Sequence, residues 1–229
     1  MNIDNLVTPA FRQVAIKGIN KVFYKSDEIG KFNLSFVDED NKIAFIRNRV
    51  CTILWNLLSE ANIANHFVKS TGPNEQMVHS LEMLPFFVEG YLLTDEKLSK
   101  RLGCSQGIKL KNHLIEVFLK NKENSNPIIG RDHLINFEWV NEKEWDQILN
   151  DTKRILDVFQ GFFKAFGVSL VSVKVEFGRL YQNGNFLKLM AGDEMSLKNI
   201  QVSFDDMLDV GEEDTMLELA KRFDVLKND

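Results

Sequence analysis

Three charged side chains late in the chain could together bind a metal ion and the phosphates of a nucleotide. Lys174 and Glu176 are two positions apart in the stretch LVSVKVEFGRL, and Asp193 follows in GDEMS. One or two carboxylates plus phosphate oxygens satisfy Mg²⁺, and a lysine offsets the phosphate charge. The same residues are also typical of a solvated hairpin face with cross-strand ion pairs. Residue types alone leave both interpretations open.

A β-hairpin would bring these three side chains together. Asn183-Gly184 is a strong signal for a two-residue turn, because both central residues need a positive φ. Residues 171–177 alternate in polarity, with Val171, Val173, Val175 and Phe177 on one face and Ser172, Lys174 and Glu176 on the other. Pairing outward from the turn sets Tyr181 against Phe186, Phe177 against Met190 and Lys174 against Asp193. This register predicts one patch formed by Lys174, Glu176 and Asp193.

The elements that would position this patch come in a mixed order. Strand-like stretches cover residues 21–25, 32–37, 66–70, 76–84 and 114–120. Helical periodicity covers residues 43–62, 95–103 and 212–226. The clearest helix begins at Asn141, where Glu144 completes a capping box, and it ends at Gly167. Strands and helices in this order predict an α+β fold.

Composition narrows the class of protein. A net charge of −5 over 229 residues argues against a nucleic-acid-binding surface. No run reaches the roughly 18 apolar residues of a membrane span, and MNIDNLVTPAF lacks the features of a secretory signal. Cys51 and Cys104 show no motif spacing, and the four histidines lack metal-ligand spacing. We therefore expect a cytoplasmic protein with free thiols and with no membrane or nucleic-acid partner.

Several segments resemble one enzyme family in the same order along the chain. LVSVKVEFGRL and GDEMS are similar to the LVDFKLEFG and ADEIS segments of SAICAR synthetase, an ATP-dependent ligase of purine synthesis. That enzyme joins aspartate to the carboxylate of an aminoimidazole ribonucleotide, CAIR. The other matching segments are KGINKVFY (17–24), ANHFVKS (64–70), EMLPFFVEGYLLTDEKLSKRLG (82–103) and LIEVFLKNKENSNPIIGRDH (114–133). The resemblance covers roughly residues 17 to 206.

The resemblance implies a fold and a nucleotide site. It implies an antiparallel-sheet-rich small lobe, residues 1–86, and a larger α+β lobe, residues 87–229, with ATP in a cleft between them. The residues implied to bind ATP are Lys21, Lys174 and Glu176. Glu176 and Asp193 are implied to bind Mg²⁺.

The positions that resemble the ribonucleotide-binding residues of the family carry different side chains. Tyr91 aligns with an arginine, Ser172 with an aspartate, and Gln201 with a second arginine. The segment after Val37 lacks the family's basic Gly-Lys-Gly loop. The altered acceptor site predicted in this way consists of Tyr91, Glu96, Lys97, Lys198 and Gln201.

These differences predict a divergent member that uses Mg-ATP to ligate or phosphorylate an altered, unidentified small-molecule acceptor. Two alternatives are a non-catalytic scaffold or regulatory relative, and a genuine SAICAR synthetase. The sequence assigns no catalytic residue, and the chain could form a homo-oligomer.

Overall fold

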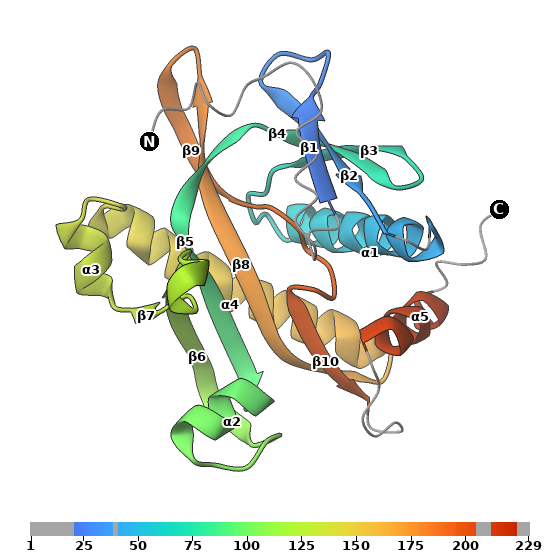
Figure 1. Ribbon diagram of the computed structural model, residues 1–229, viewed down its shortest axis with the longest axis vertical. Helices are drawn as coiled ribbons and strands as arrows, with labels where there is room; N and C mark the ends of the chain where they lie inside the picture. The colour runs from blue at the N-terminus through green and yellow to red at the C-terminus, as the bar shows by residue number, and fades with distance from the viewer. Residues whose placement is uncertain (1–20, 39–40, 205–211, 224–229) are drawn as a thin grey trace.

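The protein folds into two antiparallel β-sheets with helices packed on them, as the computed structural model shows for residues 21–38, 41–204 and 212–223 (Figure 1). The first sheet has the order β1-β2-β4-β3, formed by β1 (Lys21–Lys25), β2 (Lys31–Phe36), β4 (Glu75–His79) and β3 (Phe67–Gly72). Helix α1 (Asn41–Glu60) packs on this sheet and also contacts α5 (Glu212–Arg222).

The second sheet has six strands and carries most of the predicted site. Its strands have the order β10-β8-β5-β6-β7, and β9 pairs with the C-terminal half of β8, whose N-terminal part pairs with β10. The strands are β5 (Leu81–Leu93), β6 (Lys109–Leu119), β7 (Ile128–Ile129), β8 (Val168–Gln182), β9 (Asn185–Gly192) and β10 (Ile200–Phe204). The helices beside it are α2 (Glu96–Leu102), α3 (Arg131–Asn136), α4 (Glu142–Ala165) and a 3₁₀ turn, Lys122–Asn124.

Helix α4 covers one face of this sheet (Figure 1). At Gly90 an added Cβ would lie 2.7 Å from Leu156 Cδ1, so α4 can pack closely on β5 only where the strand carries glycine. The side chains of Glu89 and Tyr91, on either side of Gly90, point away from α4, since side chains alternate along a strand. We call this second face the distal face; it carries Phe87, Glu89, Tyr91, Ser172, Lys174 and Glu176.

The predicted α+β class and most predicted helices are confirmed. The capping box of Asn141 and Glu144 starts α4, and α2 ends at Gly103 in the left-handed conformation with φ of 68°. Both features follow from local side-chain chemistry, which sequence shows directly. No helix in the described ranges is long and apolar enough to cross a membrane.

The predicted single strand over residues 76–84 is wrong. It divides into β4, which ends at His79 in the first sheet, and β5, which starts at Leu81 in the second. Pro85 lies inside β5, where the pairing with β8 shifts between Met83 and Phe87, because proline has no N–H to donate. The change of sheet therefore comes at Ser80, whereas the expected lobe boundary at residue 86 lies within β5. The division into two lobes stays a prediction.

The predicted hairpin is confirmed at its turn and wrong beyond it. Tyr181 pairs with Phe186 as expected, but Leu180 then pairs with Lys188. The extra residue, Leu187, is a β-bulge that moves the register by one. As a result Phe177 pairs with Ala191 and not with Met190, and Glu176 pairs with Gly192, the last residue of β9. Lys174 has no strand partner at Asp193.

A second irregularity changes the alternation at Val171. On β10, Gln201 pairs with Ser172 and the adjacent Val202 pairs with Leu170, so Val171 is the extra residue. Val171 is half-buried, whereas Ser172 is almost fully buried. The regular alternation is therefore interrupted at Val171, while Val173, Val175 and Phe177 are buried on the apolar face as predicted.

Candidate active site

Glu176 is held between two lysines on the distal face. Lys174 Nζ lies 3.3 Å from Glu176 Oε1, and Lys120 Nζ, just after β6, lies 2.6 Å from Oε2. Lys120 also donates to the Leu84 carbonyl at 2.8 Å, which fixes its ammonium group. The Lys174 ammonium lies 4.4 Å from the centre of the Phe87 ring, a cation–π contact. Lys174 and Glu176 thus meet as predicted, and Lys120 joins them without having been predicted.

Asp193 directly follows β9 and pairs with Lys21 of β1. Lys21 Nζ lies 2.6 Å from both carboxylate oxygens of Asp193. Asp193 has a φ of 69°, a left-handed conformation that is uncommon outside glycine. Burial raises the pKa of Asp193, but the ammonium of Lys21 outweighs burial and holds that pKa below its ordinary value. Burial lowers the pKa of Lys21, but the carboxylates of Asp193 and Glu194 more than reverse this effect, so the pKa of Lys21 is raised. Lys21 and Asp193 are therefore both charged at neutral pH.

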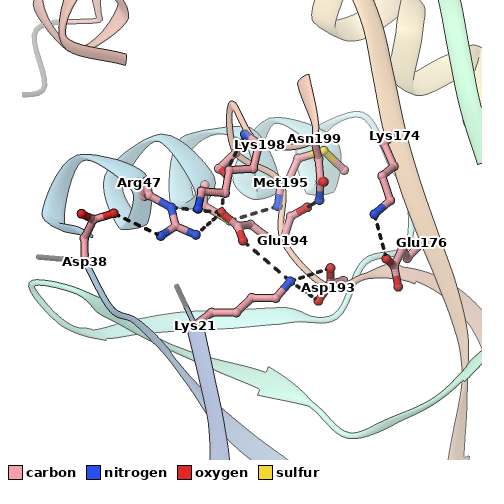
Figure 2. A network of polar contacts seen from close by, with 12 residues as sticks. Lys21, Asp38, Arg47, Lys174, Glu176, Asp193, Glu194, Met195, Lys198 and Asn199 are labelled. Atoms are coloured by element: carbon pink, nitrogen blue, oxygen red, sulfur yellow. Dashed lines mark hydrogen bonds and ion pairs between the residues drawn. The ribbon is translucent and has the colours of Figure 1, made fainter. Parts of the chain in front are cut away.

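The two ion-paired groups lie near each other (Figure 2). The charge of Lys174 lowers the pKa of Asp193, and the charge of Glu176 raises the pKa of Lys21, so each pair acts on the other. We call Lys21, Lys120, Lys174, Glu176 and Asp193 the lysine–carboxylate cluster. The turn after Gly192 brings Asp193 to this cluster, and not the strand pairing that the sequence predicted.

A buried arginine holds the loop that carries Asp193 (Figure 2). Arg47 of α1 donates to Glu194 Oε1 from Nη2 at 2.8 Å and from Nε at 3.2 Å. Ser196 Oγ donates to the same carboxylate oxygen, and Asn199 Nδ2 donates to the Glu194 carbonyl at 2.7 Å. Glu194 therefore anchors residues 193–199 to α1 and fixes the position of the neighbouring Asp193.

The cluster fits Mg²⁺ only if a nucleotide supplies further ligands. Within the described residues, no group of three or more His, Cys, Asp or Glu side chains could hold a metal ion. Glu176 and Asp193 offer two carboxylates, and Mg²⁺ is usually bound by one or two carboxylates together with substrate phosphates and water. The donor set is therefore that of a magnesium–nucleotide complex and not of a free ion.

The predicted acceptor residues Tyr91 and Gln201 lie in one row across the sheet. Tyr91 of β5 pairs with Ser172 of β8, which pairs with Gln201 of β10. Ser172 Oγ donates to Gln201 Oε1 at 3.3 Å. Tyr91 is 2% exposed and its hydroxyl is hydrogen-bonded to Glu89; burial raises the pKa of that hydroxyl. The row has hydrogen-bonding groups but no positive charge of its own.

The other predicted acceptor residues are exposed. Glu96 and Lys97 lie in the first turn of α2, where Glu96 pairs with Lys100 at 2.5 Å. Lys97 is close enough to Glu89 to lower the pKa of that carboxyl. Lys198 lies in the loop before β10, and its backbone N–H donates to Ser196 Oγ at 3.3 Å. The structure therefore links Lys97 to the distal face and places Lys198 within the loop that Glu194 anchors.

Comparison with known proteins decides the family. A family model described as SAICAR synthetase matches residues 16–214. The chain belongs to the SAICAR synthetase family. A relative named phosphoribosylaminoimidazole-succinocarboxamide synthase, from Parvibaculum lavamentivorans, is 30% identical over 196 residues, which cover 81% of this chain and 77% of that protein.

Solved SAICAR synthetase structures share the fold. The phosphoribosylaminoimidazole-succinocarboxamide synthase of Ehrlichia chaffeensis superposes with a TM-score of 0.86 at 22% identity, over 93% of this chain and 99% of that chain. A SAICAR synthetase solved in complex with ADP superposes with a TM-score of 0.83 at 21% identity, over 93% and 98% of the two chains. The predicted SAICAR synthetase-like α+β fold is thus confirmed.

Besides Lys120, the sequence reasoning missed two further charged residues of this SAICAR synthetase family member. Arg47 lies on the apolar stripe of α1, four positions after Ile43 and three before Val50, and an arginine on such a stripe indicates a buried partner. Glu89 interrupts the apolar run FFVEGYLL, which is the same kind of signal. Burial raises the pKa of Glu89 above its ordinary value, although a hydrogen bond from Tyr91 opposes this.

Proposed function

We propose that this chain binds Mg-ATP at the lysine–carboxylate cluster and catalyses an ATP-dependent ligation of a carboxylate with an amine. The observation that carries the proposal is the arrangement of Lys21–Asp193 beside Lys174–Glu176. In each pair a lysine neutralises a carboxylate. When Mg-ATP binds, the two lysines would contact its phosphates and the two carboxylates would bind Mg²⁺, so each charge would exchange its present partner for a new one of opposite sign.

Each residue of the cluster then has a defined task. Lys21 and Lys174 bind phosphate oxygens, and Lys120, held by the Leu84 carbonyl, keeps Glu176 oriented. Glu176 and Asp193 would hold Mg²⁺, which supplies further positive charge to the phosphates. Arg47 and Ser196 keep the loop of Asp193 in place through Glu194. The relative solved with ADP supports a nucleotide as ligand.

For the acceptor, we propose the reaction after which the curated relatives are named. They are called phosphoribosylaminoimidazole-succinocarboxamide synthases, and about four fifths of this chain aligns with them. The expected reaction consumes ATP, CAIR and aspartate and releases ADP, phosphate and the succinocarboxamide product.

Two measurements test these proposals. Calorimetry with Mg-ATP should show binding that Asp193→Ala abolishes and that Asp146→Ala, an exposed carboxylate on α4, leaves unchanged. ADP release in the presence of CAIR and aspartate should proceed at ordinary enzyme rates of about 1 s⁻¹ or more. If Asp193→Ala binds Mg-ATP as tightly as the unsubstituted protein does, the lysine–carboxylate cluster is not the nucleotide site.

The row of Tyr91, Ser172 and Gln201 favours a second candidate, a ligase or phosphotransferase with an altered acceptor. A tyrosine cannot bind two phosphate oxygens as an arginine does. Each charge-assisted contact that a site lacks costs about 1.5–3 kcal/mol of binding free energy. This candidate would be supported if the protein binds Mg-ATP normally but forms no ADP from ATP when CAIR and aspartate are supplied. A non-catalytic relative would in addition release no ADP with any other carboxylate and amine.

A further inference from the structure

Glu89 is a carboxylate on the distal face that the nucleotide site does not use. It lies on β5 directly opposite Lys174 of β8. Side chains of directly opposed residues have Cβ atoms about 5 Å apart and point to the same face. Glu89 is therefore the immediate neighbour of a lysine that, under the proposed function, binds the phosphates of ATP.

The neighbouring carboxylates are each engaged elsewhere. Glu116, opposite Glu89 on β6, forms an ion pair with Arg101. Glu176 is bound by Lys120 and Lys174. Asp95 is 2% exposed and accepts the N–H of Leu98 at 2.7 Å as the N-cap of α2.

Glu89, in contrast, forms no ion pair with any residue in the described part of the chain, and its hydrogen-bond partner is the hydroxyl of Tyr91. Its side chain is only partly buried, so a ligand on the distal face can reach it.

We propose that Glu89 is the general base of the ligation and takes the proton from the amine that forms the new bond. The inference rests on the proposed function. ATP transfers its γ-phosphoryl group to the acceptor carboxylate, which gives an acyl phosphate and ADP. The amine nitrogen then forms a C–N bond with the carbonyl carbon, and the C–O bond to phosphate breaks. Glu89 takes one proton from the ammonium group, which frees the nitrogen lone pair before the C–N bond forms. Phosphate leaves with the electron pair of the broken C–O bond and takes up the second proton of the nitrogen.

The surroundings of Glu89 suit this task. The groups that face it are Tyr91 on its own strand, Lys174 on β8, Glu116 on β6, and Asp95 and Lys97 at the start of α2. Burial raises the pKa of Glu89, with Asp95 adding to the rise, and Tyr91, Lys97 and Lys174 limit it. A carboxylate with a raised pKa is a stronger base. The ligand class implied is a primary amine, because an ammonium group is attracted to Glu89 before it loses its proton.

The test compares two nucleophiles in the full-length protein. Aspartate must lose a proton to react, whereas hydroxylamine is already unprotonated at neutral pH and needs no base. With Mg-ATP and CAIR, Glu89→Gln should lower kcat for aspartate by about 10²–10⁴-fold, the usual contribution of a general base. The rate of hydroxamate formation from hydroxylamine should fall by less than about tenfold, because the acyl phosphate still forms. Asp146→Asn, which removes a carboxylate from the exposed side of α4, should leave both rates within about twofold of the unsubstituted protein.

A second variant gives a readout that a merely structural role would not change. The hydrogen bond from Tyr91 lowers the pKa of Glu89, so Tyr91→Phe should raise that pKa. Since the base must be unprotonated, the acid limb of the pH profile of kcat/KM for aspartate should move to higher pH.

Equal losses with both nucleophiles in Glu89→Gln, or an acid limb that Tyr91→Phe does not move, would overturn the role of Glu89. A lack of ADP release by the unsubstituted protein with both nucleophiles would instead refute the proposed function.

Discussion

Replacing Arg47 by methionine should destabilise the protein strongly, because the substitution leaves a buried carboxylate without its main partner. The Arg47 side chain is 0% exposed and the Glu194 side chain is 4% exposed. Removing one member of a buried ion pair costs about 3–5 kcal/mol of unfolding free energy. Lys21 at 3.7 Å and the hydroxyl of Ser196 still stabilise Glu194, so we expect a loss of about 3 kcal/mol, at the lower end.

A double variant shows whether the unpaired charge causes this loss. Arg47→Met combined with Glu194→Gln removes both charges, and such replacements are often nearly neutral for stability. The double variant should therefore lie within about 1 kcal/mol of the unsubstituted protein. Arg49→Met is the matched control: Arg49 is a half-buried arginine of the same helix whose guanidinium lies 5.5 Å from the centre of the Phe45 ring, and its loss should cost about 0.5–1 kcal/mol.

Denaturant unfolding followed by tryptophan fluorescence measures these differences as shifts of the midpoint at constant slope. A native state with the usual unfolding free energy of about 5–15 kcal/mol would still be folded in the single variant. The reasoning would be refuted by a loss below about 1 kcal/mol in Arg47→Met. It would also be refuted by a double variant as unstable as the sum of the two single variants.

Three further predictions follow from individual contacts in the structure. Lys21→Met should weaken Mg-ATP binding in calorimetry by about tenfold or more, because it removes a charge-assisted phosphate contact worth about 1.5–3 kcal/mol; unchanged affinity would show that Lys21 does not bind phosphate. Gly90→Ala should lower the unfolding free energy by about 1–3 kcal/mol, because the new Cβ would lie 2.7 Å from Leu156 Cδ1, and an unchanged midpoint would contradict this packing. The ion pair of Glu144 with Arg179 depresses the pKa of Glu144. The stability that this ion pair contributes should be fully present above the ordinary glutamate pKa and should be lost as the pH falls through the depressed pKa. Glu144→Gln should therefore remove this acid dependence of the unfolding midpoint.

Sequence reasoning succeeded where the signal is local. The capping box at Asn141, the periodicity of α1 and α4 and the Asn183-Gly184 turn depend on residues close together in the chain. The pairing beyond the turn could not be predicted, because no local pattern marks Leu187 as a β-bulge, and one extra residue moves the register of the rest of the return strand. For the same reason, two adjacent apolar stretches that belong to different sheets looked like one strand over residues 76–84.

The site was predictable to the same extent. Lys174 and Glu176 lie on one strand, so their common face follows from alternation. The contacts of Asp193 with Lys21 and of Arg47 with Glu194 join residues more than a hundred positions apart. No local pattern encodes such contacts. The resemblance to a family indicated Lys21 and Asp193, and an arginine on an apolar stripe was the remaining signal for Arg47.

The arrangement of the six-stranded sheet has a consequence for how the chain folds. Its central strands β5 and β8 pair Val88 with Val175, across more than a third of the sequence, whereas β1 and β2 of the first sheet are joined by a short turn. Contacts between distant segments form slowly, because a long loop must close before they stabilise the chain. During synthesis the first sheet and α1 can assemble early, while β5 remains without its partner until β8 has been made. We therefore expect the pairing of β5 with β8 to limit the folding rate, and the site on the distal face to form only in that last step.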